Sequence, residues 1–142
     1  MKALLDTCVI MDAVQNRLPF AQDAQAIFLA AANDVFVGHV TAKAMTDIYY
    51  LTHRCTHDSG TAKTVTGRIG QLFGILDTTE SDIRRALASN LSDFEDAVMV
   101  ETALRENMDC IVTRNLSDNQ NAPLPVYAPR EFLNRLREVF DG

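Results

Sequence analysis

The sequence predicts an α/β fold in which a central parallel sheet carries helices on both faces. Short apolar runs that read as strands alternate along the chain with longer segments of helical period, and this alternation is typical of parallel sheets. The length of 142 residues fits one domain with a core of its own, and no linker, repeat or low-complexity segment interrupts it. We therefore expect a single domain over residues 1–142.

The strands are read from runs of apolar residues bounded by polar or turn-forming ones. Four runs and a shorter fifth give a sheet of four to five strands, at residues 2–6, 35–38, 73–76, 109–113 and 124–127. The first run ends in Asp6, which places an acid at the carboxyl end of a strand. The apolar pattern continues to Ile10, and Asp12 after it reads as the N-cap of the next helix.

The helices are read from apolar residues at helical spacing and from residues that favour helix starts. They are expected over residues 20–33, 42–54, 61–72, 80–89, 93–107 and from 129 onward. Thr41 and Thr79 are predicted N-caps, and Pro129 suits the first turn of the last helix.

Composition excludes several classes of protein. Hydrophobic residues make up 47% and charged residues 23%, as in ordinary globular proteins, and no apolar run approaches the roughly 20 residues of a membrane span. The N-terminus lacks a signal-peptide pattern, and three widely spaced cysteines favour reduced thiols in a cytoplasmic protein. A net charge of −6 argues against nucleic-acid binding through bulk charge, so contact with RNA would need a local basic patch or a bound metal.

The helix predicted at 93–107 does not confine its charged residues to one face, as an ordinary surface helix does. Ser92 and Glu95 have the spacing of a capping box, which would start the helix there. At about 100° per residue, Asp93 and Asp96 share a face with small apolar residues, and Glu95 lies on the opposite side. Acids that face inward need a cation, a metal or hydrogen-bond donors as partners, so two of them favour a functional role.

Several side chains that carry oxygen atoms stand at or near the ends of predicted strands and helices, where we expect them to meet at one edge of the sheet. They are Asp6, Asp47, Asp93, Asp96, Thr113, Asn115 and Asp118. Carboxylates gathered there would repel one another unless a cation neutralised them. Oxygen ligands suit Mg²⁺ or Mn²⁺, which bind phosphate and activate water for phosphodiester hydrolysis. Asp47 has a second interpretation, an ion pair with Lys43 four residues before it.

Four segments resemble the PIN domain, a metal-dependent nuclease fold, and the resemblance spans nearly the whole chain. They are Leu5-Asp6-Thr7-Cys8-Val9, the run from Ala44 to Tyr50, Asp93-Phe94-Glu95-Asp96-Ala97, and the run from Ile111 to Asp118. The chain looks most similar to small bacterial VapC-like toxins. The resemblance implies a three-layer α/β/α sandwich, cleavage of RNA with Mg²⁺ or Mn²⁺, a homodimer and a cognate antitoxin as partner.

The resemblance also implies roles for individual residues. Asp6, Asp47 and Asp96 match the family's first three acids, although many relatives have Glu at the second position. Where many relatives have a fourth Asp this chain has Asn115, and Asp118 or Asp93 could supply the missing charge. Three further groups follow by motif or position: metal ligands Asp6, Asp93, Asp96, Asn115 and Asp118; supporting residues Thr7 and Thr113; and substrate-binding residues Lys43, Arg54 and Arg114.

The same residues permit other interpretations. A haloacid-dehalogenase-type phosphatase needs a second Asp where this chain has Cys8, and a phospho-receiver domain needs adjacent acids after the first strand. A zinc site at His53, Cys55 and His57 has suitable residue types, but an exposed helix end is favoured. A catalytically weakened module that binds RNA or a protein partner stays open because of Asn115.

Overall fold

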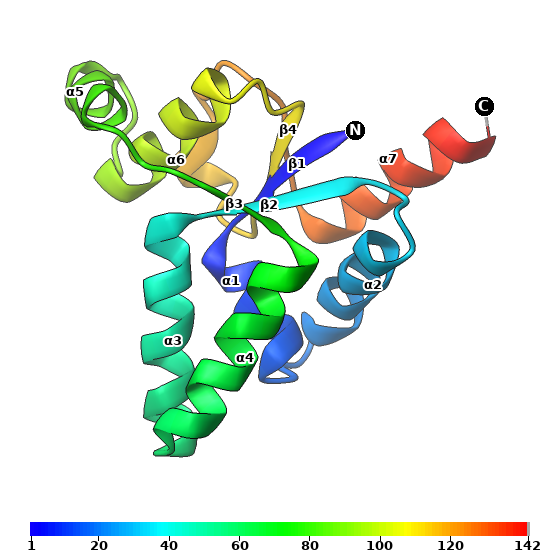
Figure 1. Ribbon diagram of the computed structural model, residues 1–142. Coiled ribbons are helices and arrows are strands. Elements are labelled where there is room, and N and C mark those ends of the chain that lie inside the picture. The colour runs from blue at the N-terminus through cyan, green and yellow to red at the C-terminus, as the bar shows by residue number, and fades with distance from the viewer. Residues whose placement is uncertain (142) are drawn as a thin grey trace.

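The computed structural model describes residues 1–141, which form a parallel β-sheet with helices on both faces (Figure 1). The described strands pair in the order β3-β2-β1-β4-β5, and every pair is parallel. They span Lys2–Leu5 (β1), Val37–Thr41 (β2), Gly74–Leu76 (β3), Cys110–Val112 (β4) and Val126–Tyr127 (β5). The predicted α/β fold and its parallel sheet are therefore confirmed.

Seven α-helices lie within the described part of the chain: Thr7–Val14 (α1), Ala21–Ala32 (α2), Ala42–Thr56 (α3), Ser59–Leu72 (α4), Glu80–Ala88 (α5), Phe94–Arg105 (α6) and Pro129–Asp141 (α7). A short 3-10 helix, Ser117–Asn119, follows β4. The six predicted helices are all present, and Thr41 and Thr79 cap α3 and α5 as expected.

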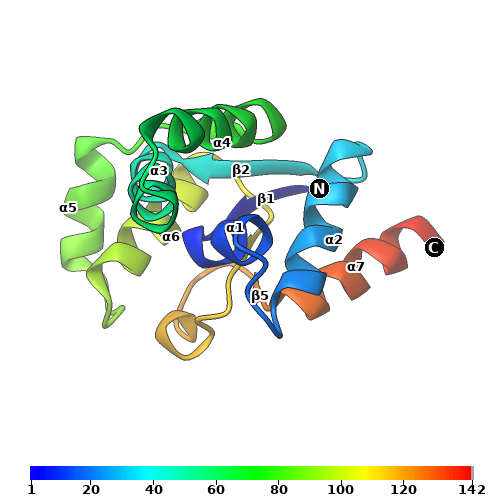
Figure 2. The ribbon, with the colours of Figure 1, turned by 90° about the horizontal axis from the view of Figure 1, so that it is seen from below.

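Helix α1 was not predicted, and the interpretation of Asp12 was wrong. Asp6 is the N-cap of α1, while Asp12 lies inside the helix and is fully buried. Five of its eight residues are buried, so the helix has no polar face to give its sequence a helical period. Viewed from below, α1 lies over the middle of the sheet between α3 and α2 (Figure 2).

The two faces of the sheet have separate cores because side chains alternate along each strand. Ala3 and Leu5 of β1 pack into a core that includes residues of α1, α2, α3 and α7. Leu4 points to the other face, where it packs with Met99, Val100 and Ala103 of α6. Figure 1 shows α5 and α6 on one side of the sheet and α1 to α4 on the other, which completes the three layers.

The order of the strands creates a switch point next to β1. The chain runs outward from β1 through β2 to β3, then returns to place β4 on the other side of β1. Ligands of open parallel sheets bind at such a point, just beyond the carboxyl ends of the strands. Leu5 pairs with Val112, and the Asp6 N–H donates to the Val112 carbonyl at 3.0 Å. The residues that follow β1 and β4, Asp6 and Thr113, are therefore neighbours.

Helix α6 begins one residue later than its predicted capping box implied. Asp93, not Ser92, is the N-cap, and its carboxylate accepts a hydrogen bond of 2.9 Å from the Asp96 N–H. Ser92 and Glu95 have capping spacing, but so do Asp93 and Asp96 one residue on. The actual register uses the second pair, so the predicted Ser92–Glu95 box is wrong.

The polar side of α6 faces α5 and is not fully solvated. Asp82 of α5 is 1% exposed and accepts hydrogen bonds from the Thr102 hydroxyl and the Arg105 guanidinium. Burial acts to raise the pKa of Asp82, but the hydrogen bonds from Arg105, the Thr79 N–H and Thr102 outweigh it and lower the pKa. A buried ion pair therefore joins the two helices.

Cys8, Cys55 and Cys110 are free thiols. Within residues 1–141, no helix combines the length and the apolar character that crossing a membrane requires.

Candidate metal centre

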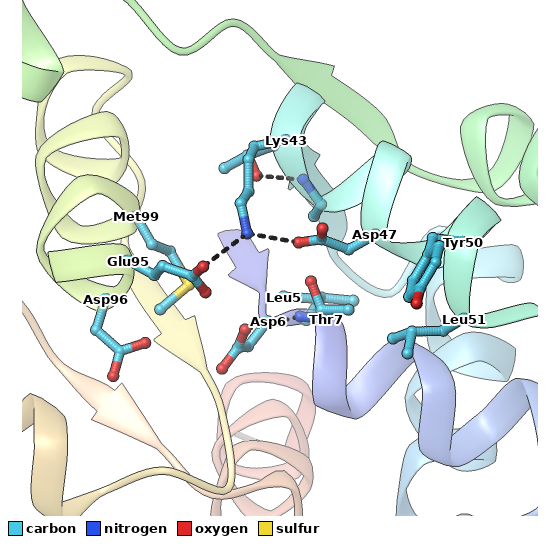
Figure 3. A pocket seen from close by; sticks show the side chains of 12 residues that line it. Leu5, Asp6, Thr7, Lys43, Asp47, Tyr50, Leu51, Glu95, Asp96 and Met99 are labelled. Atoms are coloured by element: carbon cyan, nitrogen blue, oxygen red, sulfur yellow. Dashed lines mark hydrogen bonds and ion pairs between the residues drawn. The ribbon is translucent and has the colours of Figure 1, made fainter. Parts of the chain in front are cut away.

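A pocket of about 350 Å³ opens at the carboxyl ends of the central strands, and we call it the acidic pocket. Its charged lining consists of Asp6, Asp47, Glu95, Asp96 and Lys43 (Figure 3). Four carboxylates and one ammonium give this lining a formal charge of −3 when all are ionised. The side chains come from the end of β1 and from helices α3 and α6, so the fold gathers acids that lie far apart in the sequence.

The carboxylate of Asp6 is held in a fixed orientation. Its Oδ1 accepts from the Thr7 N–H at 2.8 Å, and its Oδ2 accepts from the Thr113 hydroxyl at 2.7 Å. Thr113 is fully buried, and the Asn115 N–H donates to the Thr113 hydroxyl oxygen at 3.0 Å. The predicted supporting residues Thr7 and Thr113 thus contact Asp6 directly.

Asp96 is the most perturbed carboxyl of the pocket. It is 8% exposed, at the first turn of α6. Burial is the largest cause, and the charges of Asp6, Asp93, Asp118 and Glu95 add to it in that order, so that the pKa of Asp96 is raised to about 6. A buried acid whose pKa is raised by other acids is a group that a cation would stabilise.

Asp93, Asp96 and Asp118 bring one carboxylate oxygen each to within 4.8 Å of one another. Asp118 lies in the 3-10 helix after β4, which carries it back toward the start of α6. Asn115 is exposed, and its backbone carbonyl accepts a hydrogen bond of 2.8 Å from the side-chain amide of Asn119. The two acids suggested as compensation for Asn115 are therefore the ones that lie beside Asp96.

Lys43 spans the acidic pocket between α3 and α6. Its ammonium lies 2.7 Å from Asp47 and 3.2 Å from Glu95 (Figure 3). Partial burial acts to lower the pKa of Lys43, but the hydrogen bonds to Asp47 and Glu95 outweigh it and raise the pKa. Asp47 forms the expected ion pair with Lys43 and also lines the acidic pocket, and its catalytic role stays a prediction.

The other two basic residues predicted to bind substrate, Arg54 and Arg114, are not among the residues that line the acidic pocket. Arg114 donates to the buried Asp12 at 2.6 Å and lies 4.0 Å over the ring of Phe20, so its charge is already paired with a buried acid. Arg54 is exposed on α3 and does not line the acidic pocket. Their roles in substrate binding stay predictions.

Two residues of the site were missed from the sequence. Glu95 was placed on the outward face of its helix, yet it lines the pocket because both flanks of the first turn of α6 border the opening. Asn119 is 2% exposed, and its amide nitrogen lies 3.5 Å from an Asp96 oxygen. Its own Oδ1 is buried without a hydrogen-bond partner. No local pattern marks Asn119, since its position depends on how the chain turns after β4.

The donor set of the site fits a hard divalent cation. The candidate ligands are carboxylate and amide oxygens, the ligands that Mg²⁺ and Mn²⁺ take. His53, Cys55 and His57 are exposed at the end of α3. Among residues 1–141, three acidic side chains that could hold a metal ion come together around Asp96. His53, Cys55 and His57 are not grouped in this way, which supports the interpretation that they lie at an exposed helix end.

Comparison with known proteins gives both a family and a fold. A family model described as PIN domain matches residues 2–117. No curated protein matches the sequence closely enough to count as a relative.

Several solved structures share the fold. A toxin–antitoxin complex from Klebsiella pneumoniae has a TM-score of 0.67 at 18% identity, covering 89% of this chain and 97% of that one. FitAcB from Neisseria gonorrhoeae gives 0.67 at 18%, covering 90% and 98%. DNA-bound VapBC from Salmonella typhimurium gives 0.67 at 13%, covering 91% and 98%. At these identities the likeness concerns the fold.

Proposed function

The chain belongs to the PIN domain family, and we propose from this premise that it is a Mg²⁺- or Mn²⁺-dependent endoribonuclease that hydrolyses RNA phosphodiester bonds. One observation carries the proposal. Asp6 and Asp96 line the same pocket, and the pKa of Asp96 is raised to about 6 by burial and by neighbouring carboxylates. Such a group of acids is stabilised by a divalent cation, and divalent cations are what phosphodiester hydrolysis needs.

We assign the residues the following roles. Asp6 and Asp96 hold the ion together with oxygens of Asp93, Asn115 and Asp118, of which Asp93 and Asp118 lie beside Asp96. When bound, the ion would supply positive charge to the phosphate and make water a better nucleophile.

The remaining residues orient the reactants. Asp47, or alternatively Asp93, positions the attacking water, and in-line displacement leaves 5′-phosphate and 3′-hydroxyl ends. Thr7 and Thr113 fix the Asp6 carboxylate through their hydrogen bonds. Lys43, Arg54 and Arg114 are the basic residues proposed to bind the substrate backbone, and Lys43 is the one that lines the acidic pocket.

Cleavage of a generic single-stranded RNA by the pure protein tests this proposal. We expect cutting with Mn²⁺, none with EDTA, and a loss of roughly 100-fold or more in Asp6→Asn, since even the residues that only orient metal ligands are worth roughly 10- to 100-fold in activity. Asp34→Asn is the matched control, because Asp34 is an exposed acid at a turn with positive φ that Asn also tolerates. Cutting that survives EDTA or Asp6→Asn would contradict the proposal.

We further propose that the protein is the toxin of a type II toxin–antitoxin pair and works as a homodimer in the cytoplasm. The fold it shares with chains of toxin–antitoxin complexes supports this. A small gene beside its own should encode an antitoxin. Expression of the chain alone should arrest bacterial growth, and Asp6→Asn or co-expression of the neighbouring gene should relieve the arrest.

A catalytically weakened PIN module that binds RNA or a protein partner is the second candidate. Asn115 favours it, because an amide at this position lacks the charge of the usual Asp. The absence of EDTA-sensitive cutting, together with no Mn²⁺ binding by calorimetry, would support this candidate over the nuclease.

A further inference from the structure

A second cavity lies beside the acidic pocket, and we call it the side cavity. It measures about 280 Å³, which is just below the roughly 300–1,000 Å³ of small-ligand sites. It shares four lining residues with the acidic pocket, Thr41, Lys43, Glu95 and Met99. A ligand group in the side cavity would therefore be next to whatever occupies the acidic pocket.

The walls of the side cavity differ from those of the acidic pocket. Ile83 of α5 and Phe94 and Val98 of α6 make them mainly apolar. Phe94 is 43% exposed and Ile83 is 36% exposed, so apolar surface is open to solvent at this place. An aromatic ring that is half exposed at the edge of a cavity can stack on a flat ligand.

One polar atom in the side cavity lacks a partner. The hydroxyl oxygen of Thr78, a lining residue, is buried and makes no hydrogen bond. A buried hydroxyl without a partner is unfavourable, because it has lost its hydrogen bonds to water without replacing them. Rotation about the single χ1 bond turns a threonine hydroxyl, so Thr78 can offer a donor and an acceptor to the edge of a ligand.

We propose that the side cavity binds an unstacked nucleobase of the RNA strand, next to the phosphate held at the acidic pocket. This inference rests on the proposed function and adds to it a site for the base beside the cleaved bond. A nucleobase has flat apolar faces, which suit Phe94, Ile83 and Val98, and a polar edge, which suits Thr78. Lys43 stands at the boundary of the two cavities, where the backbone that joins base and phosphate must pass. The base subsite therefore contributes to affinity and to the choice of the cleaved position.

The chain has no tryptophan, which permits a direct test. Phe94→Trp places a single fluorophore in the side cavity, and Leu87→Trp places one on α5 outside it, where Leu87 is 71% exposed. Both variants are titrated in Mn²⁺ with a short single-stranded RNA that has non-hydrolysable linkages, and with the same RNA carrying abasic sites. We expect the intact RNA to quench Phe94→Trp. The abasic RNA should quench it much less, and Leu87→Trp should be unaffected.

A second measurement covers the case in which the tryptophan variant folds poorly. Wild type, Phe94→Ala, Phe94→Tyr and Thr78→Val are compared for RNA cleavage in Mn²⁺. We expect KM to rise roughly 5- to 150-fold in Phe94→Ala with little change in kcat, the range that base–aromatic stacking gives. Phe94→Tyr should keep the wild-type KM, and Thr78→Val should change the preference among bases at one position.

Three outcomes would overturn the base subsite. They are equal quenching by intact and abasic RNA, an unchanged KM in Phe94→Ala, and concentration-dependent burial of Phe94→Trp without RNA, which would show a second copy of the chain in the cavity. Each of these leaves EDTA-sensitive cleavage intact, so the proposed function would stand. If the wild type neither cleaves nor binds RNA, both the base subsite and the proposed nuclease function are contradicted.

Discussion

Asp96 is an acid whose surroundings differ strongly from water. It is buried, and three aspartates add negative charge around it, which together hold its pKa at about 6 instead of 3.8. In a protein free of metal, the folded state therefore binds a proton more tightly than the unfolded state does. Stability from this group is fully present below pH 4 and is lost as the pH rises to 6.

We predict that Asp96→Asn removes the loss of folding stability that the wild type shows as the pH rises. In EDTA, the free energy of unfolding of the wild type should fall by on the order of 3 kcal/mol more than that of the variant between pH 4 and 7.5, since each pKa unit is worth roughly 1.4 kcal/mol. Urea denaturation at several pH values measures it, with Asp34→Asn as control. Parallel pH profiles for wild type and Asp96→Asn would contradict the account of this carboxyl.

Arg114 has a structural partner in addition to its proposed role in substrate binding. Its guanidinium donates to Asp12, which has no exposed surface, at 2.6 and 3.2 Å. We predict that Arg114→Met lowers the free energy of unfolding by roughly 3–5 kcal/mol, because it leaves the buried carboxylate of Asp12 with only Arg17, 3.9 Å away, as an ion-pair partner. Arg68→Met, at an exposed site on α4, is the control and should cost little. A loss below about 1 kcal/mol in Arg114→Met would mean that Asp12 does not depend on this pair.

At the scale of elements, the sequence predicted where most helices and strands begin and end. Thr41 and Thr79 carry local capping signals, and both caps are present. Helix α1 was missed because a short buried helix has no polar face to mark it. Strand β2 was placed at 35–38 but spans Val37–Thr41, since the apolar run around Phe36 gives no clear boundary.

The candidate site was predictable where its residues follow element ends. Asp6 and Asp96 could be found because one ends a strand and the other lies at a helix start. Glu95 and Asn119 could not, because their places depend on how α6 and the chain after β4 pack against the sheet. Tertiary packing of this kind leaves no periodic signal in the sequence.

The N-cap of α6 gives a prediction at this scale. Both Asp93→Ala and Asp93→Ser remove a charge near Asp96, but only Ser can still accept the hydrogen bond from the Asp96 N–H. Asp93→Ala should therefore be about 1 kcal/mol less stable than Asp93→Ser in urea denaturation. Ser92→Ala should not differ from wild type. A destabilised Ser92→Ala beside an unaffected Asp93→Ala would restore the capping box first inferred from the sequence.

At the scale of the whole molecule, strand order decides what the site can do. The switch between β1 and β4 places Asp6 beside Thr113, and α6 crosses the same edge to bring Asp96 and Glu95 into the acidic pocket. The sheet, two layers of helices and one loop are all needed to hold these acids together. Their mutual repulsion is part of the cost of folding without a cation.

A bound cation should therefore stabilise the entire fold. At pH 7.5, Mn²⁺ at about 100 times its Kd should contribute roughly 2.7 kcal/mol, which raises the Tm of a domain of this size by roughly 5–10 °C. At pH 5 the increase should be smaller, because Asp96, with a pKa of about 6, is then mostly protonated. Thermal unfolding of wild type and Asp96→Asn measures both effects. An equal increase in the two proteins would place the stabilising ion elsewhere.

Anomalous diffraction from crystals soaked in Mn²⁺ at neutral pH tests the central claim most directly, namely that Asp6 and Asp96 are brought together to share a divalent cation. The account predicts a manganese peak in the acidic pocket with carboxylate oxygens of both residues at roughly 2.1–2.3 Å, and no such peak in crystals of Asp96→Asn. An empty pocket in a well-occupied soak, or manganese bound only away from Asp6 and Asp96, would contradict it.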